Sequence, residues 1–174
     1  MELILKEFGI EYVWHFTDLS NLDSINQTEG LLSLSELTQR GLLIPKPGGN
    51  DWSHTADRMK GVDRYIHLAF VKNHPMQYIA KQDGRHPDPI WIKIKSDILL
   101  EKTTRFCSDV SNKSGVRILD SEEAKEQIDF EVLFKTLDWN DTEIFERRKA
   151  AEKSEILVPS FIPLNMIEGC YHGQ

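Results

Sequence analysis

Cysteine is scarce in this chain of 174 residues, which contains only Cys107 and Cys170. Two cysteines cannot form a disulfide framework, so the composition is typical of a protein in a reducing compartment. The chain also lacks an apolar run of membrane-spanning length. Its N-terminal part lacks the cationic start and apolar core of a secretory signal peptide. We therefore expect a cytoplasmic protein that does not bind a membrane.

Several common site motifs are missing as well. The sequence contains neither G-x-G-x-x-G nor a P-loop, which disfavours a Rossmann or nucleoside-triphosphate site, and it has no G-x-S-x-G elbow of a serine hydrolase. We expect no metal site, because the cysteines and histidines do not have the spacing of zinc ligands. The histidines considered are His54, His67, His74 and His86.

The balance of charge is acidic. Lys and Arg number 21 against 28 Asp and Glu, which gives a net charge of −7. Such a chain has no general attraction for nucleic acid, so binding of a polyanion would need a local basic surface. Hydrophobic and charged fractions of 40% and 28% are those of an ordinary globular protein, and the length fits one domain, residues 1–174.

Short strands are expected to alternate with helical turns, without regular βαβ units, which favours an α+β domain on a mixed or antiparallel sheet. The strand at 90–94 alternates apolar and polar residues and should be half exposed. Residues 45–64 are predicted to form a long functional loop. Strands are predicted at 12–17, 65–71, 90–94, 103–106, 116–119, 155–158 and 162–167. Helices are predicted from Leu19 until Gly30 ends the first one, at 35–40, from Pro75, at 121–136 and at 141–152.

His15 and Thr17 are the first candidate site residues. They are two positions apart in an aromatic and branched segment, so in a strand their side chains point to the same face. Both could then address one ligand in a cleft. A histidine satisfied in the core, beside a threonine that favours strands, explains the same pattern and stays open here.

Glu155 is the second candidate. It opens the apolar segment Glu-Ile-Leu-Val, which Pro159 ends. A carboxylate at the start of an apolar strand is partly desolvated, which is costly and makes its position informative. A glutamate that turns from the strand edge to solvent is the alternative.

Taken in chain order, these segments resemble the DarT family of bacterial ADP-ribosyltransferases. The resemblance covers residues 12–167 and depends on order and spacing, because no single piece is specific. The residues that carry it are His15-x-Thr17, Asn21-Leu22-x-x-Ile25, Gly30-Leu31-Leu32, Tyr65-Ile66, Phe70, Pro75-Met76-x-Tyr78 and Glu155-Ile156-Leu157-Val158.

The resemblance implies an ADP-ribosyltransferase-like α+β fold, in which flanking helices surround a split sheet and NAD binds in a cleft between two small sheets. It also implies an NAD-consuming toxin that modifies bases of single-stranded DNA and is countered by an antitoxin protein. His15 and Thr17 would hold the nicotinamide ribose and amide side of NAD, and Asn21 would line the same pocket. A loop arginine would contact the phosphates or the target, and Glu155 would be catalytic.

The chain departs from the family pattern at two places. The family's loop arginine has no unambiguous counterpart; Arg58 is the first choice and Arg64 the second. The basic loop around it is shortened, so specificity for DNA does not carry over. Position 153 is Lys instead of the Gln or Glu of many transferases that modify amino acids, which disfavours a protein arginine as target.

The expected chemistry centres on Glu155. Cleavage of the nicotinamide–ribose bond builds positive charge on the ribose, which a neighbouring carboxylate stabilises. The same carboxylate could deprotonate the attacking group if it lies within hydrogen-bond reach. Arg58 is expected to bind the NAD pyrophosphate in bidentate fashion, although a solvated loop charge is the alternative. Tyr65 could stack on the nicotinamide, and packing in the core explains it almost as well.

A basic cluster just before Glu155 is the predicted nucleic-acid surface. Its cations could hold a phosphate backbone, and an aromatic ring nearby could stack a base of a single strand. A solvated helix end whose cations pair with Glu143 and Glu146 is the competing interpretation. The cluster consists of Arg147, Arg148, Lys149 and Lys153, with Trp139 as the ring.

Three hypotheses for function remain. The first is an NAD-dependent transferase that modifies single-stranded RNA or DNA. The second keeps NAD but changes the acceptor to protein, water or a terminal phosphate. The third is a module of the same fold that binds nucleic acid without catalysing transfer.

Overall fold

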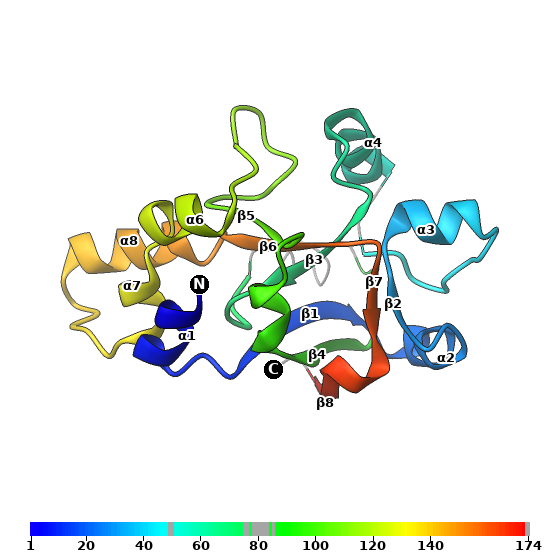
Figure 1. Ribbon diagram of the computed structural model, residues 1–174, viewed down its shortest axis with the longest axis horizontal. Coiled ribbons are helices and arrows are strands. Elements are labelled where there is room, and N and C mark those ends of the chain that lie inside the picture. The colour runs from blue at the N-terminus through cyan, green and yellow to red at the C-terminus, as the bar shows by residue number, and fades with distance from the viewer. Residues whose placement is uncertain (49–50, 75–76, 78–83, 85, 173–174) are drawn as a thin grey trace.

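The computed structural model describes residues 1–48, 51–74, 77, 84 and 86–172, which form a large and a small β-sheet with flanking helices (Figure 1). Every described strand pair is antiparallel. The predicted α+β class, with a split antiparallel sheet, is therefore confirmed. The six-stranded sheet has the order β5 (Arg105–Cys107), β6 (Glu155–Pro159), β3 (Tyr65–Ala69), β1 (Tyr12–Asp18), β4 (Pro89–Lys95) and β8 (Ile167–His172).

The large sheet opens between β1 and β3. Among their described residues these neighbours are paired only at Trp14 and Ala69. In contrast, β1 pairs with β4 from Tyr12 to Asp18, and β3 pairs with β6 from Tyr65 to Ala69. The rest of the facing edges of β1 and β3 is therefore available to line a site.

The small sheet pairs β2 (Gly30–Leu32) with β7 (Phe161–Pro163). Gly30 has φ +154, and a Cβ at this position would lie 2.2 Å from the carbonyl oxygen of Ile162. Glycine is therefore required for the two strands to approach this closely. The chain passes from β6 to β7 through Ser160, which has φ 59, so the strand that begins with Glu155 continues into the small sheet.

Two groups of helices flank the sheets, one beside β5 and β6 and the other beside β2 and β7 (Figure 1). Asp141 begins one helix by accepting hydrogen bonds from two backbone N–H groups of its first turn, and Asp129 begins another by accepting one. Among the described residues, no helix combines the length and the apolar character needed to cross a bilayer. The first group is α1 (Glu2–Phe8), α6 (Ser121–Gln127), α7 (Phe130–Phe134) and α8 (Thr142–Ala151), and the second is α2 (Leu22–Gln27) and α3 (Leu34–Gln39); 3-10 turns span Leu19–Asn21, Ser96–Leu100 and Leu164–Met166.

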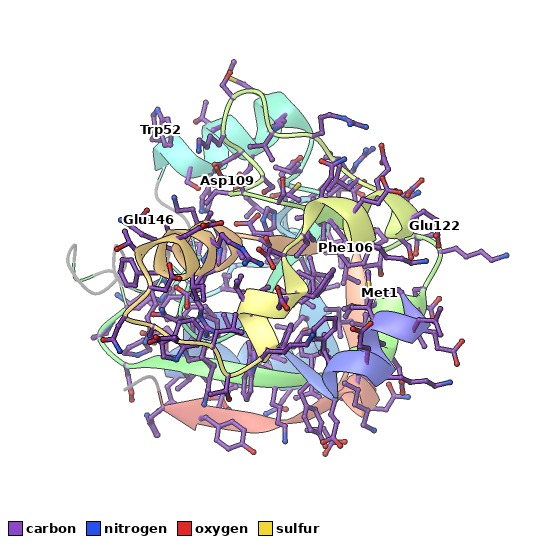
Figure 2. All side chains as sticks on the ribbon, turned by 90° about the vertical axis from the view of Figure 1, so that its left-hand side faces the viewer. Met1, Trp52, Phe106, Asp109, Glu122 and Glu146 are labelled. Atoms are coloured by element: carbon purple, nitrogen blue, oxygen red, sulfur yellow. The ribbon has the colours of Figure 1, made fainter. Side chains whose placement is uncertain are left out.

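The main apolar core lies between the large sheet and the first group of helices. Phe106 of β5 is fully buried there, enclosed by side chains in Figure 2. The Phe70 ring meets the Phe130 ring edge-on, with 5.4 Å between centroids. This core supports β6 from behind and so supports the strand that carries Glu155.

The prediction of a loop over residues 45–64 is wrong for its second half. Residues 51–60 form the helix α4 (Asp51–Lys60). The helix was missed because polar contacts hold it instead of an apolar stripe. The Lys60 ammonium donates to the carbonyl oxygens of Ser111, Lys113 and Val116.

Other boundaries also differ from the prediction. The helix expected at 121–136 is two helices, because Asp129 caps a new one at Phe130. The strand at 90–94 is not half exposed, since Trp91 is 2% exposed on the face expected to be open. Residues 116–119 contribute one isolated bridge, at Leu119. The segment 162–167, predicted as one strand, is divided between β7, a turn and β8. The helix α1 was not predicted. The helix expected from Pro75 falls on residues that, apart from Gln77, lie outside the described part of the chain.

Candidate active site

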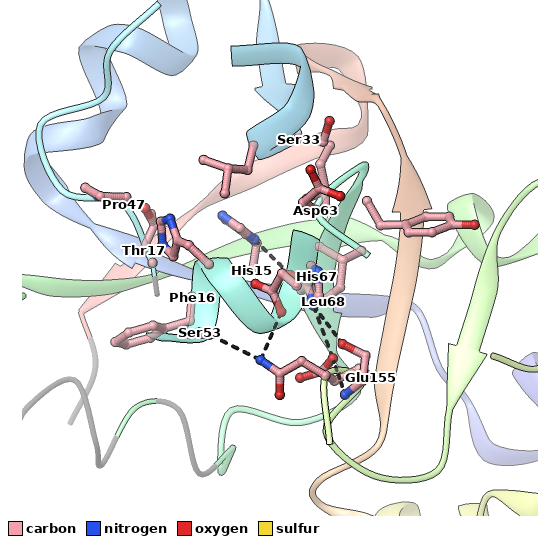
Figure 3. A pocket seen from close by; sticks show the side chains of 18 of the residues that line it. His15, Phe16, Thr17, Ser33, Pro47, Ser53, Asp63, His67, Leu68 and Glu155 are labelled. Carbon is pink, nitrogen blue, oxygen red and sulfur yellow. Dashed lines mark hydrogen bonds and ion pairs between the residues drawn. The ribbon is translucent and has the colours of Figure 1, made fainter. Parts of the chain in front are cut away.

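A cavity of about 340 Å³ opens at the split between β1 and β3 (Figure 3). Its size lies within the roughly 300–1,000 Å³ that is typical of small-molecule sites. Four residues predicted from the sequence line it together: His15 and Thr17 of β1, Tyr65 of β3 and Glu155 of β6. Residues separated by most of the chain therefore meet at one cavity.

His15 bridges the split in the sheet. Its Nδ1 lies 3.0 Å from the main-chain oxygen of His67 on β3. A carbonyl only accepts, so Nδ1 carries the proton and Nε2 is an acceptor in the neutral ring. Burial lowers the pKa of His15 to about 4, against the opposing effect of that hydrogen bond, which keeps the ring neutral near pH 7. The side chain thus positions β3 while its ring lines the cavity.

Thr17 lines the cavity and is joined to Asn21, which does not line it. The Asn21 amide donates to Thr17 Oγ1 over 2.9 Å and to the carbonyl oxygen of Lys46 over 2.7 Å. Its Oδ1 accepts from the Lys46 backbone N–H at 2.9 Å. Asn21 therefore holds the segment around Lys46 against β1.

Glu155 is buried, with 2% of its surface exposed. It lies on an interior strand, between Ala69 of β3 and Cys107 of β5. Its Oε2 accepts from His67 Nδ1 and from the Ser111 backbone N–H, each at 3.1 Å. The alternative of a glutamate turned to solvent is therefore excluded. Burial raises the pKa of Glu155, but the hydrogen bond and charge of His67 outweigh it and lower the pKa to about 2.

Several cavity residues were not predicted from the sequence. His67 is two positions after Tyr65 in a predicted strand, so the period of two could have placed it on the same face. Ser111 and Asn112 follow β5 without any local signal. The Asn112 amide donates to Asp57 Oδ1 at 2.9 Å and so joins this segment to α4. Burial raises the pKa of Asp57, which also lines the cavity.

The loop arginines lie elsewhere. Arg58 is on α4, where its Nε donates to the carbonyl oxygen of His54, and it lines neither this cavity nor the neighbouring one. The guanidinium of Arg64, the second choice, lies over the Tyr65 ring, 5.2 Å from its centroid. The structure therefore does not bring either predicted arginine to Glu155.

A second cavity of about 540 Å³ adjoins the first and shares His15 and Thr17 with it. Asn21 and Arg40 line this second cavity. Of the described residues that line the two cavities, Arg40 is the one arginine, and it pairs with Glu36 at 3.1 Å. Within the described part of the chain, no group of three or more His, Cys, Asp or Glu residues has an arrangement that could hold a metal ion.

The predicted nucleic-acid cluster lies on α8 and after it, with Trp139 before the helix, and none of these residues lines either cavity. Arg147 forms ion pairs with Asp129 and Glu131. Arg148 pairs with Glu152, donates to the carbonyl oxygens of Val132 and Leu133, and lies over the Trp139 ring at 5.0 Å. These contacts join α8 to α7. Lys149 is exposed and Lys153 half-buried.

The His67–Glu155 pair predicts how stability depends on pH. Burial lowers the pKa of His67, but the hydrogen bond and charge of Glu155 outweigh it and raise the pKa from 6.5 to about 9. The contribution of protonated His67 to the free energy of unfolding is therefore complete below pH 6.5 and is lost as pH rises through 9. The Glu155 contribution is complete above pH 4.5 and lost as pH falls towards 2. We expect the pair's contribution to the free energy of unfolding to be greatest between pH 4.5 and 6.5.

Urea unfolding as a function of pH checks this expectation. His67→Leu is the control, because it removes the titration of His67 while the groups away from the pair keep theirs. The alkaline decline should be shallower in the variant than in the wild type. Equal slopes in the two proteins would contradict the assignment.

Comparison with known proteins places these features in a family. Residues 14–173 match the sequence model of the family described as "ssDNA thymidine ADP-ribosyltransferase, DarT". Among curated protein sequences, none matches the chain significantly.

Solved structures share the fold. DarT of Thermus sp. 2.9, in complex with ADP-ribosylated ssDNA, has a TM-score of 0.68 at 16% identity, covering 95% of this chain and 83% of its own. The same protein in complex with NAD+ has a TM-score of 0.60 at 19% identity, with coverages of 92% and 81%. Thermosipho africanus DarTG in complex with ADP-ribose has a TM-score of 0.70 at 18% identity, covering 94% of this chain but 44% of its own. Because the family match extends over nearly the whole chain, this protein belongs to the DarT family of NAD-dependent ADP-ribosyltransferases.

Proposed function

We propose that this protein cleaves NAD+ in the cavity between β1 and β3 and transfers ADP-ribose to a base of single-stranded nucleic acid, with DNA thymidine as the first candidate. The observation that carries the proposal is that His15 and Glu155 line the same cavity. The family description supports the acceptor, as does the complex of Thermus DarT with ADP-ribosylated ssDNA.

The nicotinamide and its ribose are assigned to the first cavity. Its described lining contains no lysine or arginine but includes three carboxylates, Asp57, Asp63 and Glu155. Such a lining suits a cationic nicotinamide ring better than a phosphate. The neutral His15 ring and the Thr17 hydroxyl would bind the polar groups of the ribose and amide, and Tyr65 would stack on the ring.

Glu155 would act on the ribose. As the nicotinamide leaves, positive charge builds on the ribose ring, and an ionised carboxylate held in a buried site stabilises that charge more strongly than it could in water. The low pKa of Glu155 makes it a weak base, so charge stabilisation is the larger part of its role.

The pyrophosphate is assigned to the second cavity, with Arg40 as its partner. We expect Arg40→Gln to raise the KM for NAD+ by about 3- to 10-fold. A hydrogen bond to a charged group contributes on the order of 1.5–3 kcal/mol, and solvent reduces this contribution because the Arg40 side chain is 49% exposed. The rate constant kcat should change little. Arg58→Gln is the matched control, and a rise in KM in that variant instead would restore the original choice of Arg58.

The nucleic-acid target would approach the mouth of the first cavity. Trp52 lines this cavity and is 75% exposed, and Figure 2 shows it at the outer end of α4. An exposed indole beside the reactive centre can stack a base of a single strand. Of the predicted basic cluster, Lys149 and Lys153 are proposed to bind the phosphate backbone, because Arg147 and Arg148 are held by protein carboxylates, and Trp139 is covered by Arg148.

Transfer assays test the proposal directly. The protein is incubated with labelled NAD+ and matched single-stranded DNA, single-stranded RNA, duplex DNA, a protein extract or buffer alone. We expect label in single-stranded DNA that contains thymidine, with mass spectrometry placing the ADP-ribose on the base. Label in RNA would keep the enzyme and change the substrate. Label only in protein, or NAD+ hydrolysis alone, would overturn the nucleic-acid assignment.

We further propose that the protein is a toxin of the cell interior with an antitoxin partner. This chain spans 44% of the DarTG chain that it resembles, which leaves room in that protein for further domains. Toxicity on expression, removed by Glu155→Gln, would support the proposal. Toxicity unchanged by that substitution would instead favour a non-catalytic binding module.

A further inference from the structure

The surroundings of Glu155 include a second ionisable group in direct contact. Ala69 faces Glu155 and His67 faces Leu157 across the β3–β6 ladder. His67 and Glu155 are therefore diagonal neighbours on one face of the sheet. Their side chains meet, with 3.1 Å between Nδ1 and Oε2, and Figure 3 shows the pair beside His15.

The contacts of His67 define its charge. The Nδ1 atom faces the Glu155 carboxylate, and Nε2 lies 3.2 Å from the carbonyl oxygen of Val62. The Val62 oxygen can only accept, so Nε2 carries a proton. Nδ1 donates as well when Glu155 is a carboxylate, and the ring is then an imidazolium, the form favoured by a His67 pKa raised to about 9. The Ser111 hydroxyl is 3.3 Å from the same Nδ1 and can accept from it as well.

The carboxylate depends on this cation. A carboxylate as deeply buried as Glu155 loses its hydration, and without a positive partner it takes up a proton near neutral pH. The Ser111 N–H supplies a second hydrogen bond to Oε2 but no charge. The other titratable or charged groups around the pair are His15 of β1, Asp57 and Lys60 of α4, His74 after β3, and Cys107 and Asp109 of β5 and the segment after it.

We propose that His67 is a positioning residue of the transferase: its imidazolium holds the Glu155 carboxylate ionised and aimed into the cavity, and so sets the acid limit of activity. The proposal rests on the function proposed above, because it concerns the ionisation state in which Glu155 acts on the ribose. The shift of the Glu155 pKa to about 2 is in the direction that this contact requires.

Two substitutions of similar size separate charge, hydrogen bond and packing. In His67→Asn the amide nitrogen lies near the position of Nδ1 and can donate to Glu155 without a charge. His67→Leu fills the same space without a donor. The Glu155 carboxyl is observed by ¹³C NMR, with its signal assigned by its loss in Glu155→Gln, and kcat and KM are measured over the same pH range.

In the wild type we expect the Glu155 carboxyl to stay ionised down to the acid limit of folding. In His67→Leu its midpoint should rise by about 2 pH units or more, within the range known for buried carboxyls, and by less in His67→Asn. Below the new midpoint, kcat in His67→Leu should fall by about tenfold for each pH unit, following the ionised fraction of Glu155. It should recover as pH increases, while the KM for NAD+ changes much less.

An unchanged Glu155 titration in His67→Leu overturns the proposal, and so does a loss of kcat by the same factor at every pH, which indicates a purely structural role. If His67→Leu does not fold, the titration of His67→Asn decides alone, since a midpoint equal to that of the wild type rejects the role of the charge. The NMR experiment needs no substrate. A wild type that transfers nothing would therefore disprove the proposed function without deciding the role of His67.

Discussion

Glu155→Gln is expected to reduce ADP-ribosyl transfer by about 10²–10³-fold or more, the range found when a preorganised group that stabilises transition-state charge is removed. Gln has nearly the same shape but no charge, so it cannot offset the positive ribose. NAD+ affinity should drop much less, because the ground-state ribose carries no such charge. Single-turnover release of nicotinamide, with binding of NAD+ measured by calorimetry, tests both expectations.

The substitution has a second effect that requires a control. It leaves the His67 imidazolium without its counter-ion, and breaking a buried pair costs about 3–5 kcal/mol of stability. The double variant Glu155→Gln with His67→Asn removes the unpaired charge and should recover part of the stability without recovering transfer. Glu168→Gln, a surface glutamate paired with Lys95, should behave as the wild type. Transfer above a tenth of the wild-type rate in Glu155→Gln would remove this residue from the chemistry.

His15→Leu should weaken both the fold and NAD+ binding. The carbonyl oxygen of His67 loses its donor across the split between β1 and β3. Leaving a buried acceptor unsatisfied costs about 1–3 kcal/mol. Loss of the ring's acceptor nitrogen from the cavity should raise the Kd for NAD+ by about 10- to 100-fold, since each 1.4 kcal/mol corresponds to a factor of ten.

His15→Asn separates these two roles. The Asn amide can donate to the same carbonyl oxygen, so urea unfolding should show most of the lost stability restored. NAD+ affinity, measured on the same sample, should stay low because the imidazole is gone. If Asn restores affinity together with stability, His15 is a core residue that supports the strand, and the alternative left open by the sequence is correct.

Local sequence was sufficient where one side chain or one short pattern decides the outcome. The aromatic and branched residues around His15 and Thr17 predicted a strand, and the period of two in a strand placed both side chains on one face. The apolar run after Glu155 predicted another strand. The same reasoning failed for α4. Its side chains are mostly polar, and the contacts that hold it, such as Asn112 to Asp57, join segments distant in the chain.

The order of short segments along the chain was sufficient to indicate the family, because each segment keeps its place relative to the others even where no motif is specific. The partners of Glu155 could not be inferred in that way. His67 and Ser111 reach its carboxylate only because β6 lies between β3 and β5, and strand order depends on how the whole core packs. For the same reason the sequence pointed to Arg58 as the partner of the NAD pyrophosphate, whereas folding places Arg40 at a cavity wall. Residue type reveals which chemistry is available, but the tertiary structure decides which groups meet, because a charge or a hydrogen bond acts over only a few ångströms.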